Sequence, residues 1–303
     1  MTARQYPVRR FFEGLVGART LPYLLHLRPL EWPIMSAHFL LGTLLAAGWG
    51  LPLGPSLLGW LVFVALMNGG TLAINSAFDK DEGDIGYLKA PPQPPRHLLA
   101  FSSALLGAAT LLGFLLPLSF ALINLACVAM SVLYSVPPPR LKARAGWDLL
   151  INCIGFGLLT PLAGWALTGR PFSRAILLTS AGFAFLFATL YPMTQIYQVA
   201  EDSRRGDRTL VIRLGVGRSL VLALLAALVA HGCFLAAILT LGRAPAYLLP
   251  SLLAWLTVLL PWLRGWRTWT DPQHEAGMYW GLGAWAVTDL SLLALLWPQA
   301  ISR

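Results

Sequence analysis

The sequence predicts an all-α, polytopic membrane protein in which nine transmembrane helices surround a central cavity, with a cytoplasmic N-terminus. Hydrophobic residues make up 57% of the chain and charged residues only 12%, whereas soluble domains contain roughly a quarter charged residues. Apolar runs of about 20 residues recur along the chain, which is the length a helix needs to cross a bilayer. A third observation, the alternation of Lys and Arg between successive loops, sets the orientation.

The apolar runs define nine predicted spans and one domain. In chain order the spans cover residues 32–50, 56–78, 97–117, 119–136, 147–168, 174–198, 217–240, 244–263 and 277–297. No segment rich in Ser, Gly or charge divides them. We therefore expect a basic N-terminal arm over residues 1–30 and a single transmembrane domain over residues 31–303. The arm lacks an apolar core with a small-residue cleavage site, so it is not a typical secretory signal, and an organelle transit peptide is the alternative.

The positive charges support both the span count and the orientation. With the N-terminus inside, 18 of the 22 Lys and Arg residues fall in inside segments and 4 in outside segments, as the positive-inside rule requires. This distribution assigns most of the net charge of +9 to membrane topology rather than to nucleic acid. The three cysteines lie inside apolar runs without metal-ligand spacing, so we interpret them as packing residues.

Acidic residues gather at the inside ends of two predicted spans. The chain has 13 acids, and seven of them lie in two clusters: Asp79, Asp81, Glu82 and Asp84 after the second span, and Glu201, Asp202 and Asp207 after the sixth. Both clusters lie at the same membrane depth, so they can face each other across a cavity. Acids at a helix C-terminus oppose the helix dipole, which makes a functional site more plausible than solvated helix ends, the alternative interpretation.

The spacing of these residues suits Mg²⁺. Asn75, Asp79 and Glu82 share one helical face, as do Gln198 and Asp202, with Glu201 one residue before Asp202. Mg²⁺ prefers hard oxygen ligands and is typically held by one or two carboxylates together with substrate phosphates. The predicted metal ligands are Asn75, Asp79, Glu82, Gln198, Glu201 and Asp202.

A basic loop lies on the same predicted side of the membrane. Residues 134–144 form a Pro-rich turn that carries Arg140, Lys142 and Arg144, and such cations stabilise the charge that develops on a departing phosphate. Ordinary positive-inside charge is the alternative explanation. Polar residues also occur inside spans, where they usually face the bundle interior. Among them we interpret Asp289 as a structural hydrogen-bond partner and His38 as a satisfied interior residue.

Three motifs in this order resemble the UbiA-type intramembrane prenyltransferases. Asn75 and Asp79 followed by further acids look like the first family signature, which normally reads Asn-Asp-x-x-Asp-x-x-x-Asp. Residues 197–215, with Glu201, Asp202 and the run Gly206 to Leu210, look like the second signature. The stretch Tyr134 to Lys142 is similar to the family's Tyr-Ser-x-Pro-Pro-x-Arg-Leu-Lys. The resemblance covers nearly the whole chain.

Several positions depart from the family pattern. Ser76 and Gly83 stand where the first signature usually has Asp, and Gln198 stands where the second usually begins with Asp. The loop after the first signature has Lys89-Ala90-Pro91 and a later Arg96 in place of the usual Arg-Pro pair. Asn75, Asp79 and Asp202 keep the matching positions, while the remaining ligands and the roles of Lys89 and Arg96 are less well defined.

The resemblance implies a Mg²⁺-dependent transfer of an isoprenyl group from an isoprenyl diphosphate to a lipophilic acceptor, aromatic or tetrapyrrole-like, with release of diphosphate. It implies catalytic roles for Asp79, Asp202, Lys142 and Arg140. It implies diphosphate binding by Lys89, Arg96, Arg140, Lys142 and Tyr197. The acceptor, the prenyl chain length and the oligomeric state stay open.

Two other functions fit the same residues. A membrane terpene cyclase of the same family would ionise the diphosphate without an acceptor, and a transporter or scaffold would not need the carboxylates at all. For any of the three, the expected location is the bilayer, as a multi-pass protein of a prokaryotic cytoplasmic membrane with the site facing the cytoplasm.

Overall fold

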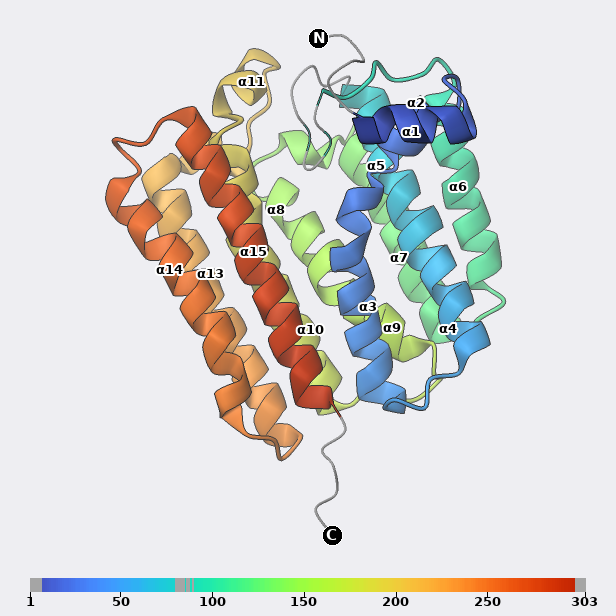
Figure 1. Cartoon of the computed structure of the whole chain (residues 1–303), viewed down its shortest axis with the longest axis vertical. Coiled ribbons are helices and arrows are strands. Elements are labelled where there is room, and N and C mark those ends of the chain that lie inside the picture. The colour runs from blue at the N-terminus through green and yellow to red at the C-terminus, as the bar shows by residue number, and fades with distance from the viewer. Residues whose placement is uncertain (1–6, 80–84, 86–87, 89, 298–303) are drawn as a thin grey trace.

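The computed structural model describes residues 7–79, 85, 88 and 90–297. The described chain is a bundle of long helices that run side by side (Figure 1). It contains no strand within these ranges, only two isolated bridges, one between Ile85 and Leu88 and one between Arg144 and Arg208. The all-α prediction is therefore confirmed.

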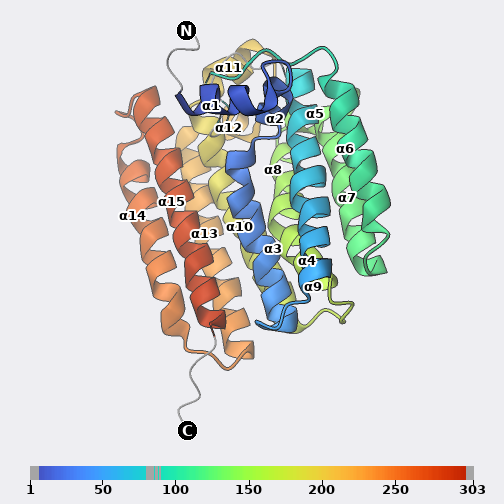
Figure 2. The same ribbon diagram turned by 45° about the vertical axis from the view of Figure 1, so that its right-hand side comes forward.

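Short elements interrupt the long helices of the N-terminal half. The first helix, α1 (Pro7–Val16), lies across one end of the bundle (Figures 1 and 2). The next elements are α2 (Leu21–His26), η2 (Pro29–Glu31), α3 (Trp32–Ala47), α4 (Leu53–Trp60), η3 (Leu61–Asn68), α5 (Gly69–Asp79), α6 (Leu98–Gly113) and α7 (Leu118–Ser135). The segment η3 is a π-helical stretch that joins α4 to α5 in one continuous rod.

The C-terminal half contains the longest helices. Its elements are η4 (Leu141–Ala143), α8 (Trp147–Asn152), η5 (Cys153–Leu159), α9 (Thr160–Ala166), α10 (Arg174–Ile196), α11 (Val199–Arg204), α12 (Leu210–Leu214), α13 (Val216–Thr240), η6 (Pro245–Leu248), α14 (Leu249–Gly265) and α15 (Asp271–Leu296). The segment η5 is a second π-helical stretch, between α8 and α9.

Eight segments of the described chain are long and apolar enough to cross a membrane. They are Leu21–Ala47, Leu53–Asp79, Leu118–Ser135, Trp147–Ala166, Arg174–Ile196, Val216–Thr240, Pro245–Gly265 and Asp271–Leu296. Each corresponds to a predicted span, and together they make the protein an integral, multi-pass membrane protein. The one remaining predicted span, residues 97–117, corresponds to α6, whose 16 residues reach only about 24 Å at 1.5 Å per residue. The count of nine is therefore close, with one helix shorter than expected.

Two further predictions concern the N-terminal region. The first candidate spanning segment, Leu21–Ala47, begins before the predicted span at residue 32, because it counts α2 and η2 together with α3. The division at residue 30 and the cytoplasmic orientation stay predictions. The structure does place α1 and the last turn of α15 at opposite ends of the bundle (Figure 1).

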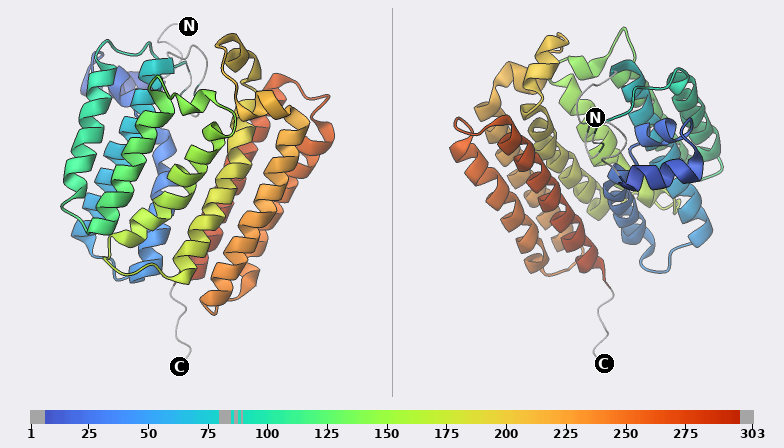
Figure 3. Two further views of the ribbon diagram at one scale, coloured as in Figure 1. Left: turned by 180° about the vertical axis from the view of Figure 1, so that it is seen from behind. Right: turned by 45° about the horizontal axis from the view of Figure 1, so that its top comes forward.

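The bundle has two main apolar cores on either side of a central region. One core joins α10, α13, α14 and α15 and contains Trp255 and Trp262, both fully buried. The other joins α3, η3, α7 and α9 around Phe63 and Phe120. Figure 3 shows the two groups of helices from behind and from above. Leucines on the outer faces, such as Leu57, are exposed, as expected where a helix meets lipid tails.

Close contact between α3 and α9 depends on glycine. A Cβ atom at Gly42 would lie 1.9 Å from the main-chain oxygen of Pro161, and one at Gly164 would lie 1.9 Å from that of Phe39. Only a residue without a side chain allows the two backbones to approach this closely. Small residues at such crossings are typical of membrane helices, where dispersion contacts rather than water drive association.

Candidate active site

A cavity of about 340 Å³ lies between the two cores. One end, which we call the mouth, is lined by Asn75, Asp79, Asp202, Arg205 and Asp207. The other end, which we call the floor, is lined by Met35, His38, Asn68, Phe156 and Trp285. The mouth lies at the end of the bundle where α5 and α11 are found (Figure 1). Asp79 of the first predicted acidic stretch and Glu201, Asp202 and Asp207 of the second therefore line one cavity.

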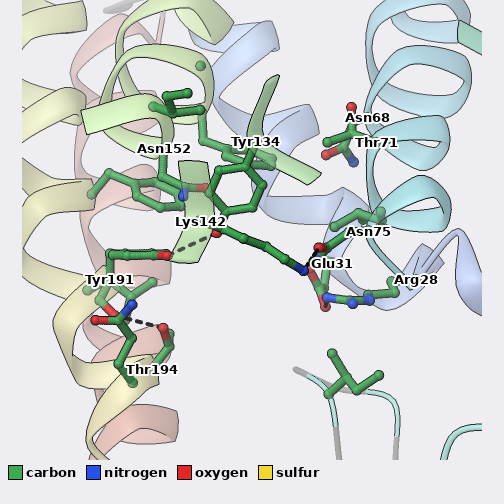
Figure 4. Close-up of a pocket in the computed structure, with 18 of the residues that line it drawn as sticks. Arg28, Glu31, Asn68, Thr71, Asn75, Tyr134, Lys142, Asn152, Tyr191 and Thr194 are labelled. Carbon is green, nitrogen blue, oxygen red and sulfur yellow. Dashed lines mark hydrogen bonds and ion pairs between the residues drawn. The ribbon is translucent and has the colours of Figure 1, made fainter. Parts of the chain in front are cut away.

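The last turn of α5 presents Asn75 and Asp79 to a lysine from the basic loop. Asn75 and Asp79 are four residues apart on one helix, so their side chains share a face. Lys142 Nζ donates to Asn75 Oδ1 at 2.6 Å and forms an ion pair with Asp79 (Figure 4). Both charged side chains are only 9% exposed. Burial on this scale strengthens the pairing, because little water competes for either charge.

A second acidic set lies on and after the short helix α11. The Arg205 guanidinium contacts three carboxylates: Asp202 at 2.5 Å, Glu201 at 3.0 Å and Asp207 at 3.4 Å. Burial raises the pKa of the Asp202 carboxyl above its ordinary value, and the adjacent Arg205 opposes that rise. Gly206, with φ of +74°, turns the chain so that Asp207 returns toward the cavity.

Arg140 links the two acidic sets directly. Its Nη1 lies 2.7 Å from Asp207 Oδ1, and its Nη2 lies 3.4 Å from Asp79 Oδ1. Arg140 has a left-handed backbone, with φ of 34°, which turns the side chain of this Pro-rich loop toward the mouth. Asp207, which lies 67 positions after Arg140 in the sequence, is thus joined to Asp79 through one guanidinium. Asp207 belonged to the predicted cluster but was not among the predicted metal ligands.

Asp148, which sequence reasoning missed, fixes the segments that carry these cations and acids. This residue is fully buried. Its Oδ1 accepts from Gly146 N at 2.7 Å, and its Oδ2 accepts from Gln195 Nε2 and Leu210 N, both at 2.9 Å. One carboxylate therefore joins the basic loop, α10 and α12. Its sequence signal is weak, because a single acid at the start of a span has no partner at helical spacing.

The other predicted site residues differ in position. Tyr197, Gln198 and Glu201 line the cavity, and Gln198 Nε2 donates to Tyr197 Oη at 3.5 Å. Arg96 is exposed and is not among the residues that line the cavity. Glu82 and Lys89 lie outside the described residues. Their predicted roles, like those of the other ligands, stay predictions.

Below the mouth, one wall of the cavity is aromatic. The Tyr134 and Tyr191 hydroxyls lie 2.9 Å apart. Phe187 lies one turn before Tyr191 on α10, and its ring stacks on that of Phe156 with 5.4 Å between the ring centroids. Phe187 also meets Trp285 edge-on at 5.6 Å. The aromatic faces form a surface suited to an apolar chain or to a carbocation.

At the floor, the Trp285 indole donates to His38 Nε2 at 2.6 Å, and Asp289 Oδ1 lies 3.2 Å from the same nitrogen. Because His38 Nε2 accepts from Trp285, it has no hydrogen to donate to Asp289, and Asp289 Oδ1 has no hydrogen-bond partner among the described residues. The interpretation of Asp289 as a structural hydrogen-bond partner therefore stays a prediction. The bond from Trp285 to His38 links α15 to α3 across the floor of the cavity.

The donor chemistry at the mouth fits a divalent cation. No group of three or more His, Cys, Asp or Glu in the described part of the chain is close enough to form a complete metal site. Mg²⁺ does not require one, because it commonly takes one or two carboxylates and completes its shell with water and phosphate. Asn75, Asp79 and Asp202 offer hard oxygen atoms at the mouth, and Glu201 and Asp207 share the Arg205 guanidinium with Asp202.

These features define a class: an intramembrane enzyme with a charged mouth above an apolar cavity. The comparisons identify the family. The model of the UbiA prenyltransferase family matches residues 35–288. The chain therefore belongs to this family and is a prenyltransferase, as the sequence motifs predicted.

Solved structures share the fold. A UbiA homolog from Archaeoglobus fulgidus bound to GPP and Mg²⁺ is 21% identical, with a TM-score of 0.70 over 91% of this chain and 99% of that one. A digeranylgeranylglyceryl phosphate synthase is 15% identical, with a TM-score of 0.68 over 92% and 98%. A UbiA homolog from Aeropyrum pernix K1 is 16% identical, with a TM-score of 0.65 over 87% and 98%. No curated protein matches the chain with significance.

Proposed function

We propose that this protein transfers an isoprenyl group from an isoprenyl diphosphate to a lipophilic acceptor inside the membrane, with Mg²⁺ as cofactor. The observation that carries the proposal is the pairing of Arg140 with both Asp79 and Asp207, at a cavity mouth that Asn75 and Asp202 also line. The A. fulgidus homolog, which was solved with GPP and Mg²⁺, supports the same substrate class and the same ion.

Asn75, Asp79 and Asp202 are the residues that would hold Mg²⁺, with Glu201 and Asp207 as neighbours. When bound, the ion supplies a Lewis acid that offsets the negative charge of the diphosphate oxygens.

Lys142 and Arg140 bind the diphosphate. Both cations pair with Asp79. When a diphosphate binds, these cations therefore exchange the Asp79 carboxylate for phosphate oxygens. The planar guanidinium of Arg140 can grip two phosphate oxygens at once. As the bond between C1 and the phosphate oxygen breaks, both electrons leave with the diphosphate, and the two cations stabilise the charge that develops there.

The aromatic wall holds the isoprenyl chain. Tyr191, Phe187 and Trp285 surround the chain with ring faces, which stabilise an allylic cation and exclude water. An electron pair of the acceptor then forms the new bond to C1, and the proton that the acceptor gives up leaves with the basic diphosphate. The membrane-embedded cavity allows both lipophilic substrates to meet without leaving the bilayer.

The test is product analysis by mass spectrometry with protein in nanodiscs, Mg²⁺ and a series of isoprenyl diphosphates, with and without an acceptor pool. We expect prenylated product only with acceptor, and its loss in Asp79→Asn and Asp202→Asn. Asp271→Asn, an exposed acid at the start of α15, is the matched control. A terpene formed without acceptor would instead indicate a cyclase, and unaltered function in both site variants would indicate a transporter or scaffold.

A further inference from the structure

Asn68 is an unusual residue in the cavity wall. It is the last residue of η3 and is 1% exposed, and it lines the cavity near the floor. Neither its Oδ1 nor its Nδ2 has a hydrogen-bond partner among the described residues. A buried primary amide without partners costs folding free energy, and such groups are rare in native proteins. The burial of this unpaired amide therefore needs an explanation, which is either a bound ligand or a structural role.

Nearby polar side chains do have partners. Thr71 Oγ1 lies 2.5 Å from Ser131 Oγ and donates to Met67 O at 2.8 Å. Ser131 Oγ lies 2.8 Å from Cys127 O. The hydroxyls next to Asn68 are thus satisfied by one another and by the backbone, and they leave the amide without a protein partner. In Figure 4, Asn68 and Thr71 extend from their helix toward the space in front of Tyr134.

The backbone at Asn68 is also special. Residues 61–68 form a π-helical stretch, and the second π-helical stretch, residues 153–159, contributes Gly155 and Phe156 to the same cavity. Single π-helical turns occur frequently at functional sites. Two of them beside one cavity indicate that the wall is shaped for a ligand rather than for close packing of helices.

The distance between Asn68 and the mouth suits an acceptor with a single ring. Asn68 precedes Asn75 by two helical turns, which is about 10 Å along the helix axis. An acceptor bound at Asn68 would fill the space between this amide and the reacting carbon below the diphosphate. The aromatic wall that includes Phe187 and Tyr191 would contact its face.

The charge around Asn68 narrows the ligand class. Of the cations that line the described cavity, Arg28, Lys142 and Arg205, each contacts a residue of the mouth or of the last turns of α5. A carboxylate at the depth of Asn68 would therefore be buried without a compensating charge, which is costly. A neutral hydroxyl or ring carbonyl would be satisfied by the amide, which donates two hydrogens and accepts at its oxygen.

We propose that Asn68 is the specificity-determining residue for the acceptor and binds a neutral phenolic hydroxyl or ring carbonyl. This proposal rests on the proposed function, because it assigns the acceptor of that reaction. Asn68 positions the acceptor and takes no part in ionising the diphosphate.

The test measures binding of three single-ring probes to protein in nanodiscs, by equilibrium dialysis with radiolabelled ligand and with empty nanodiscs as background. Hydroquinone has two hydroxyls, p-xylene has methyl groups at the same positions, and 4-hydroxybenzoate has a carboxylate. In the presence of Mg²⁺ and geranyl diphosphate, we expect the wild type to bind hydroquinone about tenfold more tightly than either of the others, since one buried hydrogen bond has this effect.

In Asn68→Leu we expect the preference for hydroquinone over p-xylene to disappear, with geranyl diphosphate affinity unchanged and the thermal midpoint not lowered. Asn68→Gln, which keeps an amide, should retain part of the preference. Asn124→Leu is the matched control: Asn124 is a buried membrane asparagine whose Nδ2 donates to Ala109 O at 2.9 Å and which does not line the cavity. It should lose stability and keep the probe preference.

Equal binding of hydroquinone and p-xylene by the wild type would overturn the inference, even if Asn68→Leu failed to fold. Tighter binding of 4-hydroxybenzoate, or an unchanged preference in Asn68→Leu, would also overturn it. A wild type that neither binds geranyl diphosphate nor releases diphosphate with Mg²⁺ would instead refute the proposed function, so the two failures are distinguishable.

Discussion

Replacing Asp148 with asparagine removes one oxygen acceptor from a buried site that holds three segments together. The amide oxygen can still accept from Gly146 N, but the new NH₂ group would face the Gln195 Nε2 and Leu210 N donors, each 2.9 Å away. A hydrogen bond to a charged group contributes about 1.5–3 kcal/mol. Losing two gives about 3–6 kcal/mol. Gln195 can recover part of this by reversing its amide, so we expect a loss of about 3 kcal/mol.

The assay is thermal unfolding in detergent, followed by tryptophan fluorescence. A loss of about 3 kcal/mol corresponds to a fall of about 5 °C in the midpoint for a chain of 303 residues, at about 2.1 cal/mol/K of unfolding entropy per residue. Because the same carboxylate joins the basic loop to the segment after α11, diphosphate release should also fall in Asp148→Asn at temperatures where the protein is folded. Asp271→Asn should change neither quantity. An unchanged midpoint in Asp148→Asn would refute the argument that this carboxylate fixes the site.

Three further outcomes follow from particular contacts. Gly164→Ala should destabilise the protein by about 3 kcal/mol, because the new Cβ atom would lie 1.9 Å from a main-chain oxygen of α3. Gly232→Ala, on an open face of α13, should leave the stability unchanged. Equal unfolding midpoints for the two variants would contradict this prediction. Arg140→Lys should raise KM for the isoprenyl diphosphate at least tenfold, because lysine lacks the two-pronged contact, and steady-state kinetics would show it; an unchanged KM would argue against this role. Tyr191→Phe should keep most of kcat, since the ring rather than the hydroxyl faces the isoprenyl chain, and a loss beyond a hundredfold would assign the hydroxyl to the chemistry.

The parts that were predictable from sequence depend on periodicity and counting. Apolar length located the spans, and the helical spacing of Asn75 and Asp79 placed both on one face. The distribution of Lys and Arg put the two acidic stretches at one depth, and the structure brings Asp79 of the first and three acids of the second to one cavity. The exception among the predicted spans is α6. Its residues are as apolar as those of a span, but the helix is shorter than the other eight segments.

The parts that were missed depend on the three-dimensional path of the chain. The contact between Arg140 and Asp207 requires a left-handed residue in the loop, which no spacing rule predicts. Asp148 acts through loops that meet only in the folded protein. Asn68 is the last residue of a π-helical stretch, where the usual 3.6-residue periodicity fails, so the direction of its side chain could not be assigned from its neighbours.

The ion pairs at the mouth have a consequence for how a charged substrate is received. The described pairs join four carboxylates, Asp79, Glu201, Asp202 and Asp207, to three cations, Arg140, Lys142 and Arg205. Among the described residues the charges of these pairs are therefore almost balanced, and such a balanced set produces only a weak field at a distance. A diphosphate whose charge is largely offset by a divalent ion can enter by replacing carboxylates as the partner of these cations, with only a small change in that balance. Its association rate should then depend only weakly on ionic strength, unlike that of a ligand steered by a basic patch.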